Sequence, residues 1–200
     1  MIGDVDFGVS GFYGVSRDAA FEPTNFTSLG RPTALRPVYD TIAQIGLDGQ
    51  YTRDATLWKL EAIGRQGQLV RLGELHNYVA ITGGLEYTFF GLAETNADLG
   101  LIIEGAWDSR GDAALTPFEE AAIYGVRLAL NDESDTSLLL IGTTDVVSGG
   151  TSVRLEAERR GIGSWKAEVE AQEIVNPQGS DLEHDLRRDS FVRLKLSYFW

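Results

Sequence analysis

The chain has 200 residues, enough for one domain, and it carries 17 Lys and Arg against 30 Asp and Glu, a formal net charge of −13. This balance argues against binding of nucleic acid through a basic face and against docking on an anionic membrane surface through a polybasic patch. The absence of Cys excludes disulfides, thiolate zinc sites and cysteine nucleophiles, while 23 Gly and 10% aromatic residues are typical of strands joined by tight turns.

Apolar and polar residues alternate along nearly the whole chain, and helical periodicity is almost absent. The alternation predicts strands at about residues 5–15, 41–51, 58–62, 79–89, 99–108, 124–130, 137–147, 153–158, 165–172 and 192–200. Segment 137–147 is ambiguous, because residues 138–141 are continuously apolar. With flanking residues these strands reach roughly 10 to 13 residues, longer than the 5 or 6 usual in soluble sheets and close to the 9 to 11 that a tilted strand needs to cross a bilayer.

The connections between these strands alternate in length. Long connections are expected at about 16–38, 65–75, 109–119 and 176–189, and short ones near 53–54, 93–97, 131–135 and 161–164; the tight connection at 148–150 breaks the alternation. Outer-membrane barrels have long external loops and short periplasmic turns. The alternation therefore favours a membrane barrel over a soluble one.

Aromatic residues gather near the expected strand ends, where the rings of a membrane barrel form two interfacial girdles. The girdle predicted at the short-turn end consists of Tyr51, Trp58, Phe89, Trp165, Tyr198 and Trp200, and the one at the long-loop end of Tyr13, Tyr39, Tyr78 and Trp107.

The last strand ends on an aromatic residue, with apolar residues in every second place before it: Val192, Leu194, Leu196, Tyr198 and Trp200. This pattern resembles the C-terminal signal through which the barrel assembly machinery recognises bacterial outer-membrane proteins. The resemblance implies that these five residues form the assembly signal.

The chain also resembles the C-terminal half of a group of uncharacterised porin-like outer-membrane proteins of proteobacteria. The similarity is carried by residues 57–62 (LWKLEA), 83–89 (GGLEYTF), 98–101 (DLGL), 108–111 (DSRG), 127–132 (RLALND) and 186–189 (LRRD), and it extends over most of residues 39–200. Members of the group are about twice as long, which falls within the known size range of such barrels. The resemblance implies that the chain is a portion of a larger barrel. Residues 1–6 have neither the basic region nor the apolar region of a signal peptide, so we expect a mature form or a fragment.

Successive residues of a strand point to opposite faces, so the odd or even position of a residue in its strand (its parity) determines its face. Parity places most charged side chains on one face of the predicted sheet. The lumen-lining residues expected from it are Lys59, Glu61, Glu86, Glu104, Arg127, Arg154, Glu156, Glu158, Lys166, Glu168, Glu170, Arg193 and Lys195. The residues expected to face lipid are Val79, Ile81, Leu85, Leu101, Ile103, Val126, Leu128, Val153, Leu155, Val169, Leu194 and Leu196. Opposite charges on neighbouring strands pair at about 5 Å, so the charges either lock a narrow lumen or line a wide pore.

Evidence for an enzyme is thin. The two His residues, His76 and His184, fall at long-loop ends, where each could combine with an Asp as in an outer-membrane protease: Asp181 or Asp185 for His184, Asp108 for His76. The carboxylates Asp181, Glu183 and Asp185 could bind Ca²⁺ weakly, but their spacing is not that of an EF-hand. We therefore expect no catalytic residues, no cofactor and no metal.

Together these observations predict an all-β fold. Residues 1–200 are expected to form one domain, an antiparallel up-and-down transmembrane β-barrel of about ten strands or the C-terminal part of a larger barrel. The expected location is the bacterial outer membrane, the expected partners are its lipid and the assembly machinery, and the expected function is a porin-like passive channel for small polar solutes. Two alternatives stay open: a closed structural or surface-binding barrel with a salt-bridged lumen, and an outer-membrane hydrolase.

Overall fold

The computed structural model describes residues 4–69, 74–114, 120–161, 163–176 and 188–200. Within them the chain forms β1 (Val5–Val15), β2 (Ala20–Phe26), β3 (Pro32–Val38), β4 (Thr41–Arg53), β5 (Thr56–Leu69), β6 (Leu75–Phe89), η1 (Leu92–Glu94), β7 (Asp98–Asp108), η2 (Gly111–Ala113), β8 (Glu120–Ala129), β9 (Ser137–Asp145), β10 (Thr151–Arg160), β11 (Trp165–Val175) and β12 (Phe191–Tyr198). The elements η1 and η2 are single 3₁₀ turns, and no helix in the described part of the chain is long and apolar enough to cross a membrane.

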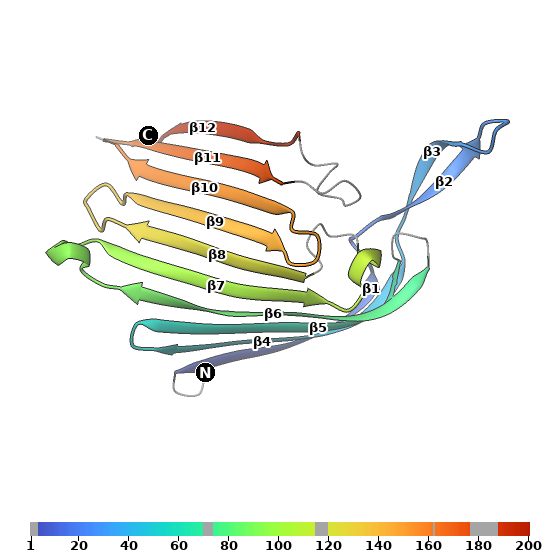
Figure 1. The fold of residues 1–200 in the computed structure, drawn as a ribbon, viewed down its shortest axis with the longest axis horizontal. Helices are drawn as coiled ribbons and strands as arrows, with labels where there is room; N and C mark the ends of the chain where they lie inside the picture. The colour runs from blue at the N-terminus through green and yellow to red at the C-terminus, as the bar shows by residue number, and fades with distance from the viewer. Residues whose placement is uncertain (1–3, 70–73, 115–119, 162, 177–187) are drawn as a thin grey trace.

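Ten strands form one antiparallel sheet in the order β1-β4-β5-β6-β7-β8-β9-β10-β11-β12, while β2 and β3 form a separate hairpin. In the sheet each strand pairs with the next one along the chain, except that β1 pairs with β4 because the hairpin lies between them in the sequence (Figure 1). This arrangement confirms the predicted all-β, antiparallel, up-and-down fold; the sheet has the expected ten strands, and the two strands of the hairpin were not predicted.

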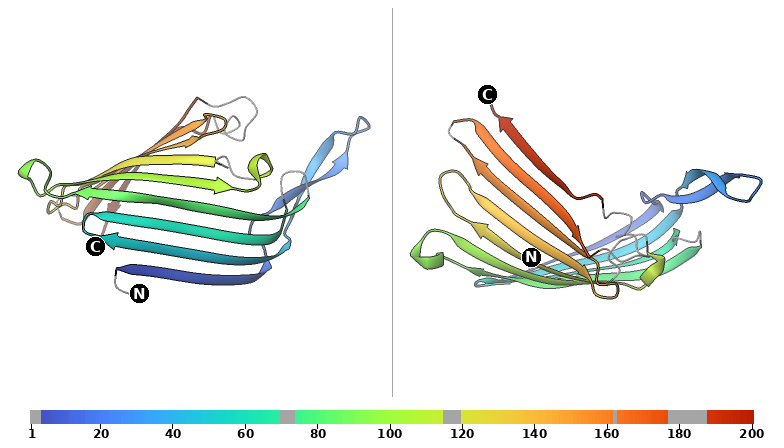
Figure 2. Two further views of the ribbon diagram at one scale, coloured as in Figure 1. Left: turned by 60° about the horizontal axis from the view of Figure 1, so that its bottom comes forward. Right: turned by 45° about the horizontal axis from the view of Figure 1, so that its top comes forward.

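The sheet is curved but open. Among the described residues β1 pairs only with β4 and β12 only with β11, so the first and last strands of the sheet each keep a free edge. The two edges lie on opposite sides of a trough (Figure 2). A closed ten-strand barrel, one of the two predicted forms, is not observed, because residue alternation specifies pairing between neighbouring strands and does not specify enough curvature to bring the outermost strands together.

Two of the predicted long connections differ in the structure. The first contains the β2–β3 hairpin, which projects away from the sheet (Figure 1). At the predicted connection 65–75, β5 and β6 continue through a register shift between Arg65 and Gln68, so that β5 ends at Leu69 and β6 begins at Leu75. Gly67 lies in this shift with φ +79°, a conformation that favours glycine.

The ambiguous segment 137–147 contains a strand. In β9, Leu138 and Leu140 pair with Ala157 and Leu155 on one face, while Leu139 and Ile141 fall on the other face. The continuous apolar run therefore supplies side chains to both faces of the sheet, and Leu138 and Leu140 remain exposed on one of them.

The strands are staggered in a constant direction. A row of paired residues that starts at Val5, the first residue of β1, passes through Leu85 in β6 and Tyr124 in β8 and arrives at Glu173, near the opposite end of β11. A row of paired residues, perpendicular to the strands, thus moves from the short-turn end toward the long-loop end as it crosses the sheet. This stagger is the geometry of tilted strands, which the wall of a barrel requires.

Candidate functional site

Strand pairing sorts the side chains of the sheet onto two faces. One row joins Arg127, Leu139, Glu156, Glu170 and Arg193, which are paired successively from β8 to β12. By the same pairing, one face holds every residue predicted to line a lumen: Lys59, Glu61, Glu86, Glu104, Arg127, Arg154, Glu156, Glu158, Lys166, Glu168, Glu170, Arg193 and Lys195. We call this the charged face.

The opposite face, called here the apolar face, is formed by the alternate residues of the same strands. It includes all those predicted to face lipid: Val79, Ile81, Leu85, Leu101, Ile103, Val126, Leu128, Val153, Leu155, Val169, Leu194 and Leu196. In the described strands of the sheet, charged residues on this face occur only near strand ends, at Arg53, Glu120, Arg159 and Glu173.

Burial on the two faces is the reverse of that in a soluble sheet. Ile103 and Leu194 on the apolar face are 59% and 76% exposed, whereas Glu86 and Asp145 on the charged face are 7% and 2% exposed. The trough therefore crowds polar side chains together and leaves an apolar surface uncovered. A contiguous uncovered surface of this kind marks contact with a membrane or a protein partner.

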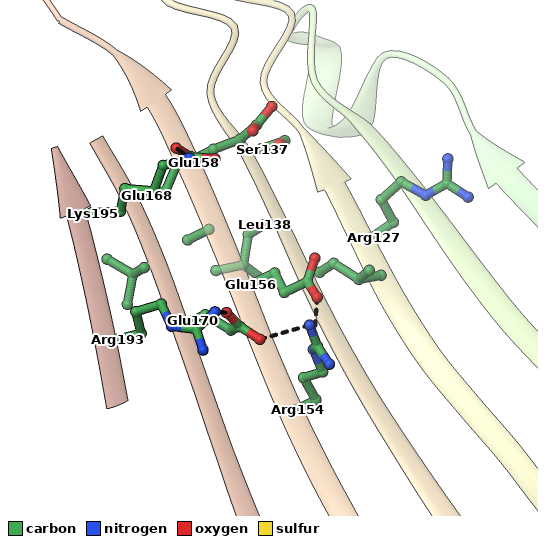
Figure 3. Close-up of a pocket in the computed structure, with 13 residues that line it drawn as sticks. Arg127, Ser137, Leu138, Arg154, Glu156, Glu158, Glu168, Glu170, Arg193 and Lys195 are labelled. Carbon is green, nitrogen blue, oxygen red and sulfur yellow. Dashed lines mark hydrogen bonds and ion pairs between the residues drawn. The ribbon is translucent and has the colours of Figure 1, made fainter. Parts of the chain in front are cut away.

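The densest charge network lies on β10, β11 and β12 (Figure 3). Arg154 donates to Glu156 at 2.7 Å and lies 2.6 Å from the Glu170 carboxylate, which also accepts from Arg193 at 2.9 Å. Each carboxylate of this group thus contacts at least one guanidinium group, and Arg154 links neighbouring strands.

A second network lies beside it, closer to the short turns. Lys166 contacts Glu158 at 2.7 Å and Glu168 at 3.3 Å, and Lys195 contacts Glu168 at 2.7 Å. The two networks border a hollow of about 500 Å³ on the charged face, which is also lined by Arg127 and Ser137. The hollow is large enough for several water molecules or a small polar solute.

Two further ion pairs join strands that are not neighbours. Lys59 on β5 lies 3.6 Å from Glu104 on β7, across Gly84 on β6, and the Glu86 carboxylate on β6 pairs with Arg127 on β8 across β7. A Cβ at Gly84 would lie 2.6 Å from the Cα of Glu104, so no larger residue fits there. Figure 3 shows Arg127 directed away from the network on β10–β12. Parity predicted that these charges share a face but could not predict their pairing across a third strand.

The other side of the charged face is acidic. Asp48 on β4 and Glu61 on β5 are directly paired in register, and Asp6 on β1 accepts a hydrogen bond from Gln50 at 3.2 Å. Among the described residues, none of these three carboxylates lies within ion-pair distance of a Lys or Arg. Like charges placed opposite each other in a sheet repel. Of the three, only Glu61 was among the lumen residues predicted from sequence; the place of Asp6 and Asp48 follows from the same parity.

A buried cluster of side chains lies at the long-loop end of the charged face. The Arg110 guanidinium lies 3.7 Å from the centre of the Tyr78 ring and pairs with Asp108 at 2.5 Å, while Arg65 contacts the same ring at 5.6 Å. Burial alone would lower the pKa of Arg110, but its hydrogen bond and charge pairing with Asp108 raise this pKa above the ordinary value. Tyr78 is 6% exposed and lies on the charged face, so its predicted place in an outward girdle is wrong.

The short-turn end of the apolar face carries the predicted aromatic residues. Tyr51 pairs with Trp58, and the rings of Trp165 and Tyr198 lie 4.9 Å apart. Val192, Leu194, Leu196 and Tyr198 of the predicted assembly signal share the apolar face of β12, and Trp200 follows the strand with its side chain exposed.

The structure describes only some of the candidate catalytic and metal-binding residues. His76 contacts only the Glu74 carboxylate among the described charged groups, at 3.5 Å. His184, Asp181, Glu183 and Asp185 lie outside the described residues. In the part of the chain that the structure describes, no three His, Asp or Glu side chains are grouped closely enough to bind a metal ion.

Comparison of the chain with protein-family models, with curated proteins and with solved structures found no significant match.

Proposed function

We propose that the chain forms the wall of an outer-membrane β-barrel that acts as a porin-like passive channel for small polar solutes. In this arrangement the apolar face contacts lipid and the charged face borders water. The barrel has no catalytic role, and passage depends on the size and charge of the solute.

The observation that carries this proposal is the distribution of exposure between the two faces. Leu194 is 76% exposed and Glu86 is 7% exposed, although water would favour the opposite arrangement. Transfer of apolar side chains out of water contributes about 25 cal/mol for each Å² removed, so an apolar face that spans the sheet strongly favours a hydrocarbon environment.

Strand geometry supports the same proposal. The sheet strands reach 15 residues in β6, and the register climbs from one end of β1 to the other end of β11. Membrane strands are tilted by about 35–45° and need about 9–11 residues to cross the hydrocarbon. The lengths and the stagger therefore support the proposal of a barrel wall.

The closed structural barrel is the second candidate, and the ion-pair networks favour it. Arg154, Glu170 and Arg193 would fill a narrow interior with paired charges and leave no path for solutes. The open trough and the hollow of about 500 Å³ favour the wider form.

Conductance across planar bilayers tests the proposal. The folded chain of 200 residues should produce discrete, ohmic current steps in KCl. Protein that is inserted in the bilayer, as shown by protease protection, but carries no current would refute the channel proposal and favour the closed barrel.

A further inference from the structure

The two free edges of the sheet, at β1 and β12, need partners in a membrane. Each edge strand is hydrogen-bonded on one side only within the described residues. Unpaired backbone N–H and C=O groups cost several kcal/mol each in hydrocarbon, so membrane sheets close. We propose that β1 of one copy of this chain pairs with β12 of a second copy, and that two copies close one barrel. This inference rests on the proposed membrane barrel.

The directions of the two strands suit this junction. Neighbouring strands in the ten-stranded sheet are antiparallel, so β1 and β12 run in opposite directions and would form the same kind of antiparallel pair as every other junction. Both chain ends lie at the short-turn end of the sheet (Figure 1). A twofold axis along the trough brings the two charged faces together around one interior and places both apolar faces outside.

The charges at the two edges are complementary. On the β12 edge, the side chains of Arg193 and Lys195 are 64% and 61% exposed although each contacts one glutamate. On the β1 edge, a Cβ at Gly8 would lie 2.5 Å from Asp48 Oδ1, so the Asp48 carboxylate of β4 lies over Gly8 and reaches the free edge. A cation from an adjoining β12 would offset the repulsion between Asp48 and its register partner Glu61.

A second copy fits these edges better than the chain's own β12. The edges of one chain lie on opposite sides of the trough, and they meet only if the whole sheet curls further (Figure 2). Such curling would force the charge networks of β5 and β10–β12 into a narrow interior. A second copy would close the barrel with less additional curling of each sheet, and it would keep the hollow on the charged face open.

Cross-linking between single-cysteine chains tests the junction. Ser10 on β1 and Ser197 on β12 both lie on the charged face, and the chain has no Cys of its own. Ser10→Cys and Ser197→Cys chains, folded together in detergent micelles and treated with a short flexible bismaleimide, should give a linked species of twice 21.9 kDa. Neither variant alone should give that species, because two copies of the same cysteine lie on opposite walls.

The double variant Ser10→Cys/Ser197→Cys separates the possible partners. Linked dimers from it support the two-copy barrel, whereas an internally linked species of 21.9 kDa, or a particle that sediments as a monomer, overturns it. A mixture of Ser10→Cys with Ser137→Cys is the matched control and should stay unlinked, because Ser137 lies inside the sheet on β9. Conductance is measured separately. Linked dimers that carry no current would refute the channel but support the junction. Current carried by monomers would support the channel but refute the junction.

Discussion

Arg127 on β8 and Glu86 on β6 form an ion pair across the intervening strand β7, above Gly100. A Cβ at Gly100 would lie 3.0 Å from Glu86 Oε1, so the glycine supplies the space through which the two side chains meet. Glu86 is 7% exposed, and Arg127 is the only cationic side chain within ion-pair distance of it among the described residues. The pair ties together three strands at the centre of the charged face.

Substitution of Gly100 by Val should separate this pair. We expect the free energy of unfolding to fall by about 1–3 kcal/mol, less than for a fully buried pair because the Arg127 side chain is 49% exposed. The control is Gly105→Val on the same strand, where a Cβ would meet nothing nearer than 3.9 Å. Urea unfolding in micelles measures both. Equal losses in the two variants would mean that the ion pair contributes nothing.

The alternation along the chain predicted the composition of the two faces, and the ten strands of the sheet follow one another in the expected up-and-down order. The charged residues at 154, 156 and 158 alternate with apolar ones, and a shift of one residue would move all of them to the other face. The pairing of Arg127 with Glu86 could not be predicted in this way, because it depends on the small volume of Gly100 on a third strand.

The β2–β3 hairpin was missed for a different reason. Its strands contain Pro23, Pro32 and Pro37, and proline interrupts the hydrogen-bond ladder of a central strand. A two-stranded hairpin has free edges toward which proline can turn, and the pairing of Pro23 with Leu35 is therefore tolerated. Tyr78 was misplaced because an aromatic near a strand end looks the same in sequence whether it faces lipid or lies between Arg65 and Arg110.

Two adjacent residues of β10 face different environments in the proposed barrel. Leu155 lies on the apolar face and Glu156 on the charged face. An Arg facing lipid at mid-depth costs about 2–4 kcal/mol, whereas an uncharged Gln facing water costs little. We expect Leu155→Arg to reduce the yield of folding into lipid vesicles severalfold and Glu156→Gln to leave it nearly unchanged. Heat-modifiable migration on gels measures the yield; the reverse order would refute the assignment of faces.

The turn between β8 and β9 should make stability depend on pH in the acid range. Hydrogen bonds from the Thr136 backbone N–H and hydroxyl, both at 2.8 Å, lower the pKa of Asp132, with a smaller contribution from Arg159. Because the pKa is lower in the folded state, the stabilisation is fully present above the unfolded-state pKa and is lost as the pH falls through the folded-state pKa.

Thermal unfolding of Asp132→Asn at several pH values tests this linkage. The variant should unfold at a lower temperature than the native chain near neutral pH, and the difference should shrink as the pH falls and Asp132 becomes protonated. Glu133→Gln changes the charge of an adjacent exposed residue in the same turn and should show a much smaller difference. A constant gap for Asp132→Asn across the acid range would show that its carboxylate charge does not stabilise the turn.

The carboxylates of β4 and β5 should contribute to ion selectivity, because within one copy of the chain no described Lys or Arg forms an ion pair with them. Asp48 and Glu61 are register partners and form no ion pair with a described Lys or Arg, whereas Glu168 and Glu170 each contact two cationic side chains. Uncompensated negative charge beside an aqueous path attracts cations and repels anions.

We therefore expect Asp48→Asn/Glu61→Gln to lower the permeability ratio of K⁺ to Cl⁻, measured as a shift of the reversal potential toward zero in a KCl gradient. The effect should weaken at high salt, because the Debye length falls from about 10 Å at 0.1 M to about 3 Å at 1 M. The control Glu22→Gln/Glu133→Gln removes the same charge from the hairpin and a turn and should leave the ratio unchanged. If both double variants shift the potential equally, selectivity follows the total charge of the protein and the acidic side of the charged face has no special role.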